Sequence, residues 1–146
     1  MMMTRAPLSF GVVAAGVLCF GLLFIAQADN THRDTATLVH VGQNPNSCGT
    51  IPGTESGVAN VRFDANRKRF KVNLSVYDAL PKTTYVVDIR CVGAIGSLTT
   101  DSLGAARTEI DLSRSAPPSS GFFIDISVFN GVTYGDTFIA GPFDLS

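Results

Sequence analysis

The sequence predicts an all-β protein: an antiparallel β-sandwich of about seven strands that follows an N-terminal signal peptide. Three observations lead to this prediction. Apolar and polar residues alternate with a period of two in several short segments. Turn-forming residues separate these segments at regular intervals, and no segment has a convincing helical pattern.

The alternating segments are expected to form strands with one apolar face. They are, in chain order, 35–41, 58–64, 70–77, 85–92 and 122–129. The segment 103–112 fits both a helical stripe and a strand. Gly104 near its start and Thr108 at its centre weaken the helix, so we expect a strand there as well.

The N-terminal 28 residues have the three parts of a secretory signal peptide. Arg5 precedes an unbroken apolar and glycine run from Phe10 to Ala26, and Ala26-Gln27-Ala28 fits a small-x-small cleavage pattern. We therefore expect cleavage after residue 28 and a secreted, extracellular protein. The alternative is an uncleaved membrane anchor over 9–26 that leaves 29–146 outside the cell. Such a run spans ~26 Å, which is marginal for a ~30 Å hydrocarbon core.

Beyond the signal peptide, we expect a leader strand and long loop over 29–57 and the body of the sandwich over 58–146. Cys48 and Cys91 are the cysteines left after cleavage, and in an exported chain they most simply form one disulfide. Cys91 is expected on the buried face of its strand. The bond would fasten the Gln43–Gly57 loop to the sheet and contribute at most about 4 kcal/mol. A reactive thiol or a thiolate metal ligand is the alternative.

Residues 80–89, Leu-Pro-Lys-Thr-Thr-Tyr-Val-Val-Asp-Ile, resemble the L-x-P-x-T-x-Y-x-V-x-V stretch of fibronectin type III and related immunoglobulin-like modules. Pro81, Thr83 and Tyr85 carry the match, together with the apolar positions that follow. The resemblance implies an immunoglobulin-like sandwich in which Tyr85 closes a corner by bonding back to the backbone. It implies no active site.

Two surface features are candidate binding sites. Positive charge is concentrated between residues 62 and 71, in Arg62, Arg67, Lys68, Arg69 and Lys71. Arg67, Lys68 and Arg69 would form a hairpin tip that meets a protein partner or an anionic surface polymer, although a solvated turn whose charge guards strand edges is the alternative. Phe123 and Phe129 alternate onto the second face of 122–129. If these two side chains are exposed, they would form an apolar patch that a partner could bind. If a loop covers them, they would be part of the core.

No catalytic, cofactor-binding or metal-ligating pattern stands out. His32, expected on a flexible leader, and His40, expected on the wet face of an edge strand, are too few for a metal cluster. The net charge of −1 argues against nucleic acid as a partner. A membrane is expected as a partner only if residues 9–26 remain uncleaved.

The sequence therefore favours an exported, non-enzymatic module that binds a macromolecule at or outside the cell surface. One alternative is a small exported hydrolase with a carboxylate site near the Gln43–Gly57 loop, which pairs Glu55 with Asp101 or Asp136. The other is a membrane-anchored structural protein.

Overall fold

The computed structural model describes residues 30–42, 48, 52–129 and 134–146. This part of the chain is all-β, with antiparallel pairing throughout. Its strands are β1 (Thr31–Gly42), β2 (Thr54–Asp64), β3 (Arg69–Val76), β4 (Thr84–Ile89), β5 (Gly93–Thr99), β6 (Ala106–Ser113), β7 (Phe122–Phe129) and β8 (Tyr134–Phe143). The predicted signal peptide, residues 1–28, and the alternative anchor, 9–26, lie outside the described residues. Within the described residues, no helix is long and apolar enough to span a membrane.

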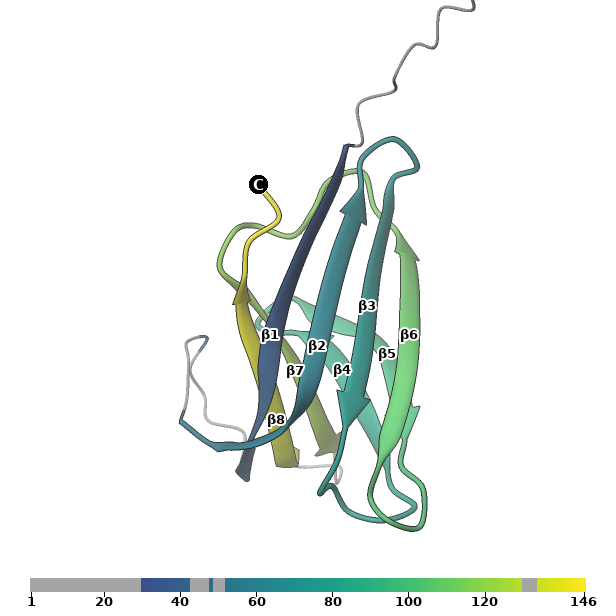
Figure 1. Ribbon diagram of the computed structural model, residues 1–146, viewed down its shortest axis with the longest axis vertical. Helices are drawn as coiled ribbons and strands as arrows, with labels where there is room; N and C mark the ends of the chain where they lie inside the picture. The colour runs from purple at the N-terminus through teal and green to yellow at the C-terminus, as the bar shows by residue number, and fades with distance from the viewer. Residues whose placement is uncertain (1–29, 43–47, 49–51, 130–133) are drawn as a thin grey trace, which may run out of the picture.

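The strands form one sheet in the order β5-β4-β7-β8-β1-β2-β3-β6, and this sheet is curled until it is nearly closed. In Figure 1, β1, β2, β3 and β6 lie toward the viewer, and β4, β5 and β7 lie behind them. The two end strands meet where Gly96 of β5 faces Ile110 of β6. A Cβ atom at position 96 would lie 2.7 Å from Ile110 Cδ1, so glycine lets the two ends approach. Such closure shortens the exposed edges through which sheets aggregate.

The core fills the inside of the curled sheet, and the predicted alternation supplies much of it. In β3, Phe70, Val72, Leu74 and Val76 are all buried, while the residues between them are partly or fully exposed. The segment whose pattern was ambiguous forms strand β6 from Ala106 onward, as predicted, and Ile110 points into the core. Burial of this apolar face, at about 25 cal/mol per Å², is the main force that holds each strand in register.

The described residues contain eight strands, and β5 and β8 are the two without a clear alternating pattern. Two glycines interrupt β5, and most of its residues are exposed. In β8, Phe138, Ile139 and Ala140 are consecutive and all buried, so both faces of this strand are covered. A strand buried on both faces needs no polar face, so the sequence of β8 shows no clear period of two. β7 was predicted from its alternation, but the expectation of a single apolar face for 122–129 is wrong, because residues 122–127 are all buried.

β1 is longer and more central than we expected, because it pairs with β2 on one side and β8 on the other. His32 lies within this strand rather than on a flexible leader, and His40 is half-buried rather than on the wet face of an edge strand. β2 begins at Thr54, and Gly57 pairs with both β1 and β3. The C-terminal boundary predicted for the Gln43–Gly57 loop is therefore wrong, because residues 54–57 belong to a strand. Residues 43–47 and 49–51 lie outside the described residues.

Candidate functional site

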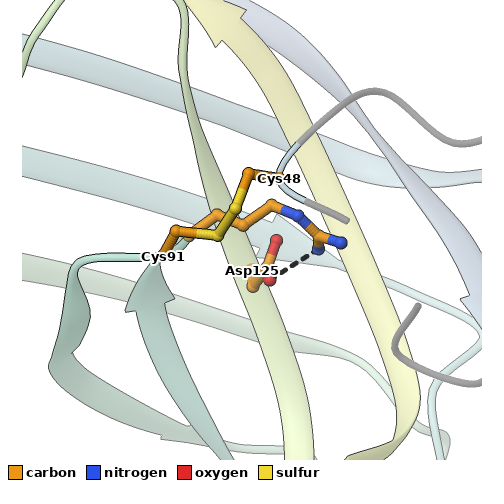
Figure 2. The surroundings of a disulfide bond; sticks show 4 residues. Cys48, Cys91 and Asp125 are labelled. Carbon is orange, nitrogen blue, oxygen red and sulfur yellow. Dashed lines mark hydrogen bonds and ion pairs between the residues drawn. A yellow bond between two sulfur atoms is a disulfide. The ribbon is translucent and has the colours of Figure 1, made fainter. Parts of the chain in front are cut away.

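Cys48 and Cys91 form the predicted disulfide, with their Cα atoms 6.1 Å apart. This separation is below the ~7 Å limit for such bonds. Figure 2 shows the bond beside Asp125 of β7. Cys91 itself is exposed, which contradicts its expected position on a buried strand face. β4 ends at Ile89, whose carbonyl accepts a hydrogen bond from the Val92 amide at 2.9 Å, so Cys91 lies in a turn.

A buried ion pair lies next to the disulfide (Figure 2). Arg90 Nη1 is 2.7 Å from Asp125 Oδ2, and the two side chains are only 4% and 6% exposed. The Arg90 amide also donates to the Phe123 carbonyl at 3.0 Å, which fixes the end of β4 to β7. The second carboxylate oxygen of Asp125, Oδ1, is buried and has no hydrogen-bond partner. Removing a buried charge from water is costly unless every lone pair is satisfied, so this pair is incompletely compensated.

Asp88 faces Asp125 directly across β4 and β7. Opposite residues of an antiparallel pair share one face of the sheet, and like charges there destabilise it. Burial raises the pKa of Asp88 above its usual value. Burial also raises the pKa of Asp125, because desolvation outweighs the opposing effect of Arg90, and the charge on Asp88 adds to the rise. Together with the turn over 89–93, these residues line a pocket of about 320 Å³.

A second polar array joins three strands through Tyr85, Asp136 and His40. The Tyr85 hydroxyl accepts a hydrogen bond from the Leu80 amide at 2.9 Å and donates one to Asp136 Oδ2. Asp136 Oδ1 is 2.9 Å from His40 Nε2. Burial, together with the bond to Asp136, raises the pKa of Tyr85 well above its usual range, so the hydroxyl remains a donor at neutral pH. The array fixes the orientation of the half-buried His40 ring, which stacks on Phe138 with centroids 4.6 Å apart.

The sequence pointed to the backbone bond of Tyr85 but not to its side-chain partners. His40 and Asp136 belong to β1 and β8, and no motif or spacing connects them to Tyr85. Only the strand order β4-β7-β8-β1 brings the three together.

The carboxylates considered for a hydrolase have different roles in the structure. Asp136 belongs to the array just described, and Glu55 accepts a hydrogen bond from Tyr77 Oη at 3.3 Å. Asp101 Oδ1 accepts bonds from the backbone amides of Leu103 at 2.8 Å and Ala105 at 3.0 Å. Because these bonds favour the charged form, they lower the pKa of Asp101. Asp101 therefore caps a turn and is a poor proton donor.

The predicted basic tip is the turn between β2 and β3, at the top of Figure 1. Arg67 is 79% exposed there, and Lys68 is exposed with a φ of 53°. Arg69 is not a free cation, because its Nε lies 2.8 Å from Asp111 Oδ1 on β6. Lys71 Nζ likewise lies 2.8 Å from Glu109 Oε1 on the same strand. Two of the five cations in the predicted basic run, Arg69 and Lys71, are thus paired across β3 and β6.

A groove of about 280 Å³ runs beside this turn, and every residue that lines it is charged. Its lining consists of Arg62, Asp64, Arg67, Arg69, Lys71 and Asp111. Four cations and two carboxylates leave a formal surplus of two positive charges. Hydrogen bonds from Arg69 and Lys71 lower the pKa of Asp111, so its carboxylate is charged at neutral pH. Arg62 Nε is buried without a hydrogen-bond partner, so the groove also contains an unused donor.

The two candidate phenylalanines have different environments. Phe123 is only 7% exposed, so its assignment to a binding surface is wrong. It packs against Gly141, where a Cβ atom would lie 2.9 Å from Phe123 Cδ1. Phe129, at the end of β7, is 51% exposed. A patch of two phenylalanines therefore does not form. In the described part of the chain, no three His, Cys, Asp or Glu residues are placed to hold a metal ion.

Replacing both cysteines, Cys48→Ser with Cys91→Ser, should lower the free energy of unfolding by up to about 4 kcal/mol, because the bond closes a long loop in the unfolded chain. Urea denaturation measures this loss. A reducing agent should destabilise the unmodified protein by a similar amount and leave the double variant unchanged. Equal stability of the two proteins without reductant would contradict the predicted contribution.

Tyr85→Phe should destabilise the fold by about 1–3 kcal/mol, because the Leu80 amide loses its acceptor and Asp136 loses a donor. Tyr77→Phe is the matched control. It removes the hydroxyl of a tyrosine that is 41% exposed, and should change stability by less than about 0.5 kcal/mol. Equal losses of stability in the two variants, measured by thermal or chemical denaturation, would show that the hydrogen bonds of the Tyr85 hydroxyl stabilise the fold no more than those of an exposed tyrosine.

Asp88→Asn should stabilise the protein at pH 7. Folding raises the pKa of Asp88 above its usual 3.8, so its charged form opposes folding increasingly as the pH rises through the folded-state value. The advantage of the variant should therefore disappear below about pH 3.8, where both folded and unfolded states bind the proton. Asp78→Asn, at an exposed turn, changes the same charge and is the control. A pH-independent difference in denaturation midpoints would exclude this explanation.

Comparison with known proteins adds no family to this description. No protein-family model matches the sequence, and no curated protein matches it.

Proposed function

We propose that this chain is an exported, non-enzymatic module that binds an anionic polymer at or outside the cell surface through the groove beside the β2–β3 turn. The observation that carries the proposal is the charge of this groove. The lining has a formal surplus of two positive charges, and the pairing of Lys71 with Glu109 outside the lining leaves a surplus of one; Arg67 is largely exposed at its rim. Clustered positive charge of this kind attracts polyanions and speeds their association.

The lining also favours a polymer over a protein as the partner. Protein interfaces have an apolar or aromatic centre that excludes water, and such centres supply most of the binding energy. The groove contains only charged side chains. Recognition here would rest on ion pairs and charge-assisted hydrogen bonds, which suit sulfate, phosphate or carboxylate groups.

Export is supported by two independent features. Residues 1–28 have the charge, apolar run and cleavage pattern of a signal peptide. The Cys48–Cys91 disulfide is of the kind that persists in oxidising compartments. The likeness of residues 80–89 to immunoglobulin-like sandwich modules also stays a proposal, supported by the hydrogen bond between the Leu80 amide and the Tyr85 hydroxyl.

The double variant Arg67→Ser with Lys68→Asn tests the groove and the turn at its rim, because Arg67 lines the groove and Lys68 is the exposed cation next to it. Binding to immobilised heparin, a sulfated polysaccharide, should weaken, and the slope of log affinity against log salt should fall by about two units because two cations are lost. Asn is chosen at position 68 because it tolerates the left-handed backbone there.

Arg107→Ser with Lys82→Asn is the matched control. It removes the same charge from exposed positions outside both the groove and the β2–β3 turn, and Lys82 also has a positive φ, of 50°. The control should retain the affinity and salt slope of the unmodified protein. If both variants lose the same affinity for heparin, the binding depends only on net charge and not on the groove. If the unmodified protein is not retained on heparin at low salt, the proposal is refuted.

A further inference from the structure

The pocket beside the disulfide has an unbalanced set of charges. Asp88 and Asp125 face each other across β4 and β7, and Arg90 is the cation that the structure places against them. Two carboxylates and one guanidinium give the pocket a formal charge of −1. This imbalance lies partly in the protein interior, because Arg90 and Asp125 are almost completely buried.

The hydrogen-bonding capacity of the pocket is unbalanced in the same direction. Asp125 Oδ2 accepts from Arg90, whereas Asp125 Oδ1 is buried and has no partner. Among the described residues, none donates a hydrogen bond to Asp88, and desolvation is what perturbs its carboxylate. Three carboxylate oxygens are therefore free, and they belong to residues that line one cavity. A buried acceptor without a donor destabilises the folded protein, so a ligand that supplies a donor here would remove that penalty.

We propose that this pocket binds a primary ammonium group. An ammonium carries one positive charge and three N–H donors, which match the deficit of one charge and the three free oxygens. The volume of about 320 Å³ is at the lower end of the range for small-ligand sites. Val92, which is 69% exposed, and the disulfide at Cys91 border the cavity and give an alkyl stem an apolar surface to lie on.

Other cations fit this pocket less well. Calcium requires six to eight oxygen ligands, and the described residues offer three free carboxylate oxygens beside the fixed charge of Arg90. A quaternary ammonium has the right charge but no N–H group, so it leaves Asp125 Oδ1 without a donor. The proposal thus distinguishes ligands by donor number as well as by charge.

Titration with n-butylammonium at constant ionic strength, followed by the amide NMR signals of β4 and β7, tests the proposal. The signals of Asp88 and Asp125 should shift with a dissociation constant on the order of millimolar, as befits so small a ligand. Tetramethylammonium, which has the same charge and no donors, should bind at least about tenfold more weakly. Equal shifts with both ions, or tighter binding of calcium chloride, would overturn the assignment.

Asp88→Asn should weaken n-butylammonium binding by about tenfold or more, because it removes one charge and one acceptor. This variant relieves a repulsion between carboxylates, so it is expected to fold. Asp78→Asn, outside the pocket, should bind like the unmodified protein. A peptide that is acetylated at its N-terminus and contains one lysine then separates two sources of the ammonium group. If the lysine side chain is the ligand, this peptide should bind, and the same peptide also acetylated at the lysine Nε should not; if neither binds, a small free amine is the ligand. Unchanged affinity in Asp88→Asn would refute the site.

Discussion

The burial of β7 on both faces is the constraint on which the rest of the structure depends. Ile124 and Ile126 point into the core, while Phe123, Asp125 and Ser127 on the opposite face are buried as well. A strand in this position must satisfy polar side chains on its outer face without water. Arg90 does so for one oxygen of Asp125, and its backbone amide holds the end of β4 against β7. The turn that contains Cys91, and with it the disulfide, starts from this fixed point.

Two carboxylates illustrate how differently the sheet accommodates buried charge. Both carboxylate oxygens of Asp136 have hydrogen-bond partners, the Tyr85 hydroxyl and the His40 ring. Asp125 has a guanidinium on one oxygen and nothing on the other. The site of Asp136 is fully hydrogen-bonded and suits a structural role, because satisfied polar networks rigidify a core. The site of Asp125 has one acceptor without a donor, so a ligand that donates a hydrogen bond there would gain binding free energy.

The basic groove owes its properties to cross-strand register. β3 and β6 pair so that Lys71 faces Asp111 and its neighbour Glu109 also comes within reach. These exposed pairs contribute little stability, typically below about 1 kcal/mol each. Their larger effect is on shape, because they hold the side chains of Arg69 and Lys71 against β6, whereas Arg67 at the turn stays 79% exposed, with Asp64 Oδ2 3.8 Å from its Nε. The proposed polyanion site is therefore a partly neutralised sheet face with a positive rim.

The sequence by itself determined the all-β class, most strands with one apolar face, and the pairing of Cys48 with Cys91. These features are local: alternation reports which face of a strand is buried, and Cys48 and Cys91 are the two cysteines outside the proposed signal peptide. The strand order, the doubly buried β7 and β8, and the contacts of Arg90, Asp136 and His40 appeared only in the tertiary structure. Their partners are set by register between segments far apart in the chain, and no period within a single segment encodes which strand will lie beside it.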